Sequence, residues 1–228
     1  GRYAEAQLAK RYGRFRDRSG ELTPLVVLAM GKLGGGELNF SSDIDIVFLY
    51  PADGESDGTR ALSGQQYFTR LSQMIVGLLD ERTADGFVFR VDTRLRPFGD
   101  SGPPVTSFAA LESYLLQHGR DWERYAYIKA RIVGQPPPPA IANELFEQLI
   151  EPFVYRRYLD YGVFESLRDM HALIAAEVKR RDLADNIKLG PGGIREIEFI
   201  VQSMQLVRGG HRETLRGPSL LHVLPKLV

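Results

Sequence analysis

The sequence predicts an α+β fold, with strands and helices in its first part and helices alone in the remainder. Two short apolar runs, residues 25–30 and 43–50, are typical of buried strands because glycine, proline or acidic residues bound them. Behind Ser63, a suitable N-cap, apolar residues recur at helical spacing as far as residue 81. Helical patterns also cover residues 2–18, 107–118, 121–133, 140–150, 152–158, 163–181 and 194–207.

A run of four prolines, 136–139, marks the predicted domain boundary, because such a run is too stiff for a helix or a central strand. Residues 1–135 then form one domain that opens with a helix, and residues 136–228 form a helical domain. The chain begins at Gly1 and stops inside an apolar stretch. We therefore expect a fragment of a longer protein that continues beyond residue 228.

Composition excludes several classes of function. The 228 residues include 29 basic and 29 acidic side chains, and this balance argues against a nucleic-acid partner. The absence of cysteine excludes disulfides, thiolate metal sites and a cysteine nucleophile, and is compatible with the cytoplasm. We find no signal peptide and no apolar run near 18 residues, so we expect a soluble protein without a membrane partner.

Residues 31–50 join a glycine-rich turn to a strand that begins with two aspartates. Asp43 and Asp45 point to the same side of this strand, where their charges repel unless a cation lies between them. Hard divalent cations such as Mg²⁺ prefer these ligands together with phosphate oxygens, and glycine lets backbone N–H groups approach a phosphate. A solvated turn is the simpler alternative, but the pair stands at the mouth of an apolar strand. The pattern predicts metal-dependent phosphoryl or nucleotidyl transfer.

A second strand is predicted over residues 87–96. One of its faces combines a carboxylate with cationic side chains, namely Val88, Arg90, Asp92, Arg94 and Arg96. Taken alone, this face would be an exposed surface with weak salt bridges. Beside the strand that carries Asp43 and Asp45, it favours Asp92 as a third metal ligand or a base next to phosphate-binding arginines.

The predicted helix over residues 194–207 follows a glycine turn that could bind an anion at the helix N-terminus, although an ordinary helix start is the simpler interpretation. Its predicted core stripe consists of Ile194, Ile197, Val201 and Met204. This leaves Arg195, Glu196 and Glu198 on or beside its polar face.

Four motifs, in order, resemble the family of bacterial glutamine synthetase adenylyltransferase/adenylyl-removing enzymes. They are MGKLGGGELNFSSDIDI at 30–46, VDTRLRPFG at 91–99, GRDWERYA at 119–126 and GGIREIEF at 192–199. The resemblance implies a polymerase-beta-like nucleotidyltransferase domain, a small mixed sheet with helices, followed by a helical domain. The motif spellings resemble the N-terminal half, the adenylyl removase. That half removes AMP from a tyrosine of glutamine synthetase by phosphorolysis and gives ADP.

The resemblance also implies roles for individual residues. Asp43, Asp45 and Asp92 would hold one or two Mg²⁺ ions, or Mn²⁺, and act in catalysis. Gly34 and Gly35 would cradle the AMP phosphate. The phosphate charge would be met by Lys32, Arg94 and Arg96. The wider superfamily often places a serine directly after its glycines; here Ser42 or Ser41 would replace it.

Three alternatives stay open at this point. The same fold could run the forward reaction and adenylylate the tyrosine with ATP. It could instead be a regulatory module with residual activity that responds to glutamine or to PII, the nitrogen-signalling protein that is a partner of the full-length enzyme. A nucleic-acid nucleotidyltransferase would share the carboxylates, but the neutral charge disfavours it.

Overall fold

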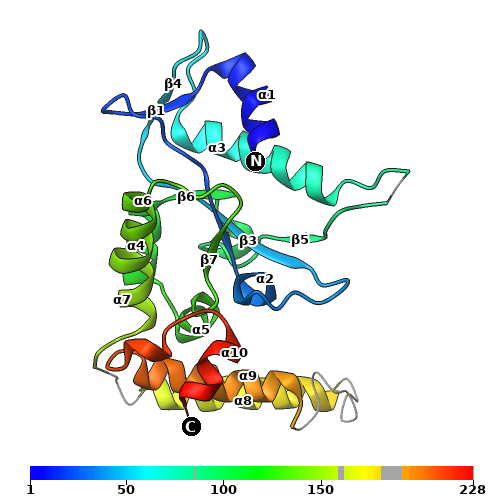
Figure 1. Ribbon diagram of the computed structural model, residues 1–228, viewed down its shortest axis with the longest axis vertical. Coiled ribbons are helices and arrows are strands. Elements are labelled where there is room, and N and C mark those ends of the chain that lie inside the picture. The colour runs from blue at the N-terminus through cyan, green and yellow to red at the C-terminus, as the bar shows by residue number, and fades with distance from the viewer. Residues whose placement is uncertain (85, 159–161, 181–191, 228) are drawn as a thin grey trace.

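The computed structural model describes residues 1–84, 86–158, 162–180 and 192–227, and it confirms the α+β class. The molecule is elongated, with a five-stranded mixed sheet in its middle part (Figure 1). The strand order is β5-β3-β2-β7, with β6 also paired to β3; β2 is antiparallel to β3 and β7, whereas β5 and β6 are parallel to β3. The strands are β2 (Val26–Ala29), β3 (Ile44–Tyr50), β5 (Val91–Asp92), β6 (Val105–Ser107) and β7 (Arg131–Val133).

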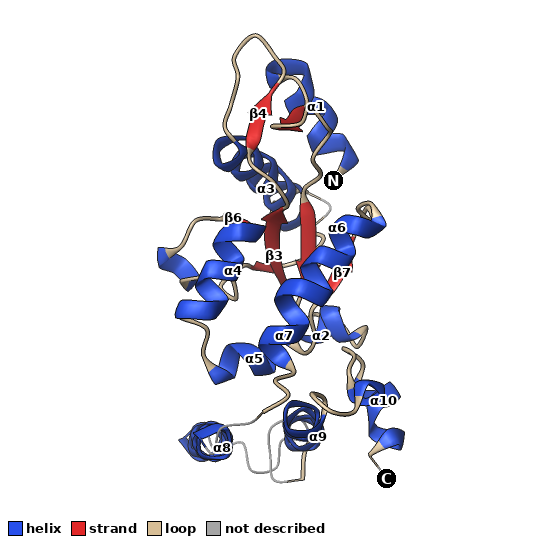
Figure 2. Cartoon of the chain, turned by 90° about the vertical axis from the view of Figure 1, so that its left-hand side faces the viewer, coloured by secondary structure: helices blue, strands red, loops and turns tan. Residues whose placement is uncertain are grey.

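Strand β3 is the centre of the sheet, and its alternating side chains build two cores. Ile46, Phe48 and Tyr50 pack with α1 (Arg2–Tyr12) and α3 (Gly64–Asp80) on one face. The other face packs against helices that include α4 (Phe108–Gln117), and Figure 2 shows the helices around the sheet. Burial on both faces explains why the predicted strand reads as a continuous apolar run.

The N-terminal segment is less helical than predicted. Helix α1 ends at Tyr12, where Gly13 takes a φ of 76°, and the chain continues into the short strand β1 (Phe15–Asp17). Strand β1 pairs with β4 (Gly54–Ser56) in a separate two-stranded sheet. The prediction for α3 is confirmed, since Ser63 caps it in a capping box with Gln66.

Two predicted elements differ in the structure. The strand over residues 87–96 is reduced to Val91–Asp92, because the preceding residues 87–89 are exposed and have no core to pack against. A turn begins at Arg94, and η1 (Gly99–Ser101) and β6 follow. The helix over residues 121–133 ends early, as α5 (Asp121–Tyr127), and residues 131–133 form β7 at the edge of the sheet.

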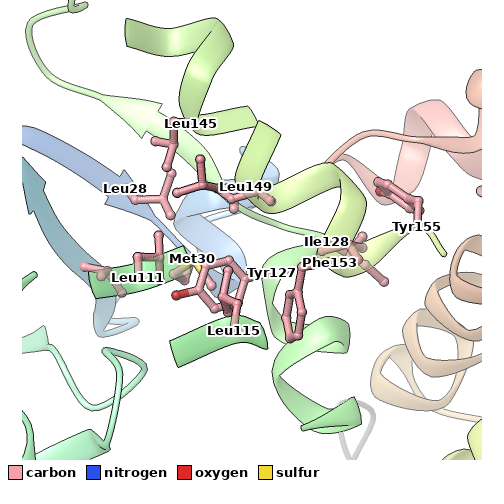
Figure 3. Close-up of a cluster of buried hydrophobic side chains, with 14 of the residues drawn as sticks. Leu28, Met30, Leu111, Leu115, Tyr127, Ile128, Leu145, Leu149, Phe153 and Tyr155 are labelled. Carbon is pink, nitrogen blue, oxygen red and sulfur yellow. The ribbon is translucent and has the colours of Figure 1, made fainter. Parts of the chain in front are cut away.

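Packing continues across the proline run. Helix α4 (Phe108–Gln117) lies beside a helical segment formed by α6 (Pro139–Asn143), the π-helical η2 (Glu144–Ile150) and α7 (Glu151–Val154). Leu145 and Leu149 of this segment share one cluster with Leu28 and Met30 of the sheet region (Figure 3). The domain boundary after residue 135 stays a prediction.

A buried arginine fixes α5 against α7. The Arg124 side chain is fully buried and donates to the carbonyl oxygens of Phe153 and Val154 at 3.1 and 3.0 Å. Burial lowers the pKa of Arg124, and the ion pair with Asp121 opposes that shift. Arg124, within the motif at residues 119–126, therefore serves packing.

The last part of the described chain is helical. It contains α8 (Gly162–Arg180), α9 (Ile194–Arg208), η3 (Glu213–Leu215), α10 (Leu220–Val223) and η4 (Leu224–Lys226). None of the helices in the described ranges is both long and apolar enough to cross a membrane.

The predicted core stripe of α9 is wrong for three of its four residues. Ile194, Ile197 and Met204 are 50%, 44% and 39% exposed, and only Val201 is buried. The buried face instead includes two glutamines, whose amides bond main-chain carbonyls: Gln202 bonds Tyr125, and Gln205 bonds Leu215 and Gly217. Because these buried residues are polar, the spacing of apolar residues in the sequence does not identify the packed face of α9.

Candidate active site

The sheet brings the predicted carboxylates to one place. Strands β3 and β5 are parallel, and Asp45 and Asp92 are partners in their register. Register partners in a sheet point to the same face. Asp43 lies two residues before Asp45, at the entrance to β3. The acidic residues predicted from two separate motifs therefore lie on two adjoining strands.

Asp45 is the least compensated of the three carboxylates. Burial is the main factor that raises its pKa, and the charges of Asp92 and Asp43 raise it further. The charge of Arg94 opposes this shift but is outweighed. Asp45 thus carries a negative charge that the protein itself destabilises, and a bound cation would relieve this cost.

Asp43 is bound by an arginine that the sequence analysis did not select. Arg90 Nε donates to Asp43 Oδ1 at 2.5 Å, and Arg90 Nη2 donates to the Ser41 carbonyl oxygen at 2.6 Å. The Arg90 carbonyl also accepts the N–H of Ile44 at 2.9 Å. Arg90 therefore links the segment just before β5 to the segment just before β3. Its position two residues before Asp92 was the available signal.

Asp92 is bound by Arg94, while Arg96 bonds its own loop, and contact of Arg96 with phosphate stays a prediction. Arg94 donates to both carboxylate oxygens of Asp92, with the shortest contact 2.5 Å, and this pair lowers the pKa of Asp92. The Arg96 side chain instead bonds the carbonyl and hydroxyl of Thr93 at 2.9 and 2.8 Å. Arg94 is therefore placed to contact a ligand of the carboxylates, whereas Arg96 mainly holds its own loop.

The glycine-rich turn is the one-turn helix α2 (Gly31–Gly35), and its first residue is in contact with the site. Gly31 has a φ of +50°, and a Cβ there would lie 2.5 Å from Asp45 Oδ2. Only glycine allows this approach without strain. The sequence analysis did not single out Gly31; its place directly after β2 was the signal.

The predicted phosphate cradle, Gly34 and Gly35, is buried. The Gly34 N–H donates to the Met30 carbonyl at 2.9 Å, and a Cβ at Gly34 would lie 1.9 Å from the carbonyl oxygen of Lys129. Position 34 therefore requires glycine because the backbone of Lys129 packs closely against it. A role in phosphate binding for either glycine stays a prediction.

Lys32 lies within α2, and Ser42 lies near the end of the loop between α2 and β3. With the Asn39 amide in its hydrogen-bonding orientation, the side-chain oxygen accepts from Lys32 Nζ at 3.0 Å. The N–H of Ser42 donates to the Asn39 carbonyl at 3.1 Å. Asn39 thus links both residues across the loop, and their contact with phosphate stays a prediction.

The donors at this site are of the kind that a hard divalent cation prefers, since Asp45 and Asp92 are carboxylates at register positions of two adjoining strands. Within the described ranges, however, no three His, Asp or Glu side chains are gathered closely enough to hold a metal ion. Asp43 and Asp92 are each bonded to an arginine. A shared metal ion at Asp43, Asp45 and Asp92 stays a prediction, and Asp43 could contribute to it only by leaving Arg90.

The raised pKa of Asp45 predicts a pH-dependent effect of Asp45→Asn on stability. A carboxyl group whose pKa is raised in the folded state lowers the stability of the fold when it is ionised, but not when it is protonated. In the absence of divalent ions, Asp45→Asn should therefore melt slightly above wild type at pH 7.5, and solvent screening of the partly exposed Asp45 should keep the difference to a few degrees at most. The difference should shrink as the pH falls towards the ordinary aspartate pKa near ~3.9.

Thermal unfolding of both chains with chelator, from pH 7.5 down to pH 4, is the measurement. Asp169→Asn, at an exposed position of α8, is the matched control and should show no such trend. An Asp45→Asn chain that melts at or below wild type at pH 7.5 would show that Asp45 is already compensated.

Comparison with known proteins places this geometry in a family. The glutamate-ammonia ligase adenylyltransferase family matches residues 2–145, which is more than half of the chain. The chain belongs to this family. Its carboxylates, glycine turn and sheet all lie within the matched part. The PII-uridylyltransferase family matches residues 168–228, the region of α8 to η4.

Curated relatives of this family member are close in sequence but much longer. A protein of Shewanella oneidensis is 56% identical over 222 residues, which cover 97% of this chain and 23% of that protein. A protein of Chromobacterium violaceum is 59% identical over 207 residues, which cover 90% of this chain and 22% of that protein. Both are named bifunctional glutamine synthetase adenylyltransferase/adenylyl-removing enzyme. The chain spans about a quarter of their length.

Proposed function

We propose that this chain is the adenylyl-removing nucleotidyltransferase unit of a bifunctional enzyme that regulates glutamine synthetase in nitrogen assimilation. The observation that carries the proposal is the pairing of Asp45 with Asp92 on parallel strands, with Asp43 two residues away. This mixed sheet, with a glycine turn before the acidic strand, supports a polymerase-beta-like fold. The names of the relatives supply the substrate, glutamine synthetase.

In the proposed reaction, inorganic phosphate attacks the phosphorus of AMP on an adenylylated tyrosine. A new P–O bond forms, the bond to the tyrosyl oxygen breaks, and the tyrosyl oxygen leaves with the electron pair and takes up a proton. The products are ADP and unmodified glutamine synthetase. Phosphate is already anionic and the phenol pKa is near ~10, so the main need is to bring anions together.

The residues of this chain have distinct roles in this proposal. Asp45 and Asp92 would hold Mg²⁺ or Mn²⁺. Asp43 would join them once its ion pair with Arg90 breaks. Such an ion supplies positive charge to phosphate oxygens when bound. Arg94, bonded to Asp92 and 71% exposed in its side chain, can turn to a phosphate oxygen. Arg90 is placed to take up a phosphate oxygen when it leaves Asp43.

The removal reaction is favoured over the forward reaction by sequence spelling alone. The motifs at residues 37–42, 119–126 and 192–199 resemble the adenylyl-removing half of the family. The match of residues 168–228 to the PII-uridylyltransferase family supports PII as a partner of the full-length enzyme. A cytoplasmic location is consistent with such partners.

A direct assay separates the two directions. The chain is incubated with adenylylated glutamine synthetase, Mg²⁺ and phosphate, and in parallel with unmodified glutamine synthetase, Mg²⁺ and ATP. The proposal requires ADP in the first reaction, dependent on phosphate, and no adenylylation in the second. Adenylylation from ATP without phosphorolysis would instead assign the forward reaction to this chain.

A further inference from the structure

A buried lysine joins the helical region to the loop that leads to Asp43. Lys129 lies just before β7, and its side chain is only 5% exposed. Its ammonium group donates to Glu37 Oε2 at 3.0 Å and also bonds Glu198 Oε1. One cation is therefore shared by two carboxylates, one from the loop after α2 and the other from α9.

Glu37 connects this cation to two further elements. It lies in the segment between α2 and β3 that leads to Asp43, and its N–H donates to the Lys32 carbonyl at 2.8 Å. Its second carboxylate oxygen, Oε1, accepts the N–H of Leu220 at the start of α10 at 2.7 Å. In Figure 1, α9 and α10 lie below α2. The loop is thus bound to both helices through one side chain.

The same edge of the sheet also holds α2 by its backbone. The carbonyl oxygen of Lys129 packs directly against Gly34, leaving no room for a Cβ. Arg131 donates to the carbonyl oxygens of Leu33 and Gly34 at 2.6 and 2.8 Å. These contacts fix the C-terminal end of α2, whose first residue, Gly31, lies against the Asp45 carboxylate.

The contacts form a continuous physical connection from α9 to the catalytic carboxylates. It runs from Glu198 through Lys129 to Glu37 and α2, and from α2 to Asp45. A buried ion pair is weak evidence for stability, since its desolvation cost offsets its attraction. It does restrict the orientation of the groups it joins, because breaking it leaves a charge unpaired.

We infer that Lys129 is a positioning residue, through which α9 sets the loop that leads to Asp43 and the turn that contacts Asp45. The expected effect on the turnover number rests on the proposed function. The structural consequence of the inference does not, because the order of the loop can be measured without any reaction.

Glu198→Gln is the variant that tests the connection most cleanly. It removes one charge from α9, far along the chain from the loop, and its side chain is partly exposed, so the fold should persist. Glu147→Gln, at an exposed position on η2, is the matched control. Amide hydrogen exchange of residues 31–43 is measured in both chains and in wild type.

We expect exchange in residues 31–43 to quicken by about 2–30-fold in Glu198→Gln and to stay unchanged in Glu147→Gln, as for coupling through a packed network. The turnover number for ADP release should fall by a similar factor, while KM for phosphate stays near wild type. Lys129→Met should show the same pattern more strongly, and Lys129→Arg should restore part of it.

Unchanged exchange in residues 31–43 would overturn the inference. So would exchange that quickens evenly over the whole chain in parallel with a lower melting temperature, because that is the signature of a purely structural ion pair. If wild type releases no ADP, the proposed function fails, and the exchange measurement still decides the inference.

Discussion

Asp45→Asn should reduce ADP release from adenylylated glutamine synthetase by about 10²–10³-fold while leaving the fold intact. A metal ion contributes several kcal/mol to the charge balance of phosphoryl transfer, and each 1.4 kcal/mol corresponds to about tenfold in rate. Asp43→Asn should have a comparable effect. The measurement is initial-rate ADP release at saturating phosphate and Mg²⁺, with circular dichroism to show that the fold persists.

The matched control is Asp169→Asn on α8, which changes the same charge at an exposed position away from the sheet. It should retain wild-type activity. If either Asp43→Asn or Asp45→Asn retains activity, the corresponding residue does not belong to the active site.

Gly31→Ala should lower the turnover number by about 10²-fold, because a misplacement near 1 Å in a catalytic site can cost that much. A Cβ at Gly31 would lie 2.5 Å from Asp45 Oδ2, and the φ of +50° disfavours any side chain. The carboxylate would have to move, since the turn is held by its own packing. The measurement is steady-state kinetics together with thermal unfolding.

Gly77→Ala is the control, since Gly77 lies within helix α3, where a Cβ would meet nothing within 4 Å. Alanine should be neutral or slightly stabilising at that position. An active Gly31→Ala chain would show that the contact between α2 and Asp45 is not needed for the reaction.

Local patterns were sufficient to predict the strand that carries Asp45 and the helix capped by Ser63. Burial on both faces gives β3 its continuous apolar run, and the capping box of α3 is written within four residues. The spacing of Asp43 and Asp45 fixes their common side of the strand in the same way. These features depend on neighbours in the sequence.

The rest depends on contacts between distant segments. Arg90 reaches Asp43 only because β5 lies beside β3, and Gly31 is needed only because Asp45 packs against it. The predicted strand over residues 87–96 is mostly absent because its first apolar residues, 87–89, stay exposed. Lys129 looked like part of a helix until the structure placed it beside Glu37 and Glu198.

Mn²⁺ binding tests the central claim that Asp45 and Asp92 share a divalent cation. The ion can be titrated into wild type, Asp45→Asn, Asp92→Asn and the control Asp169→Asn, with free Mn²⁺ followed by electron paramagnetic resonance. Wild type and the control should bind Mn²⁺ with equal affinity, and the two site variants should bind at least about 10-fold more weakly, since the loss of even one outer partner of a metal site costs about 10–100-fold. Equal binding by all four chains would contradict the account.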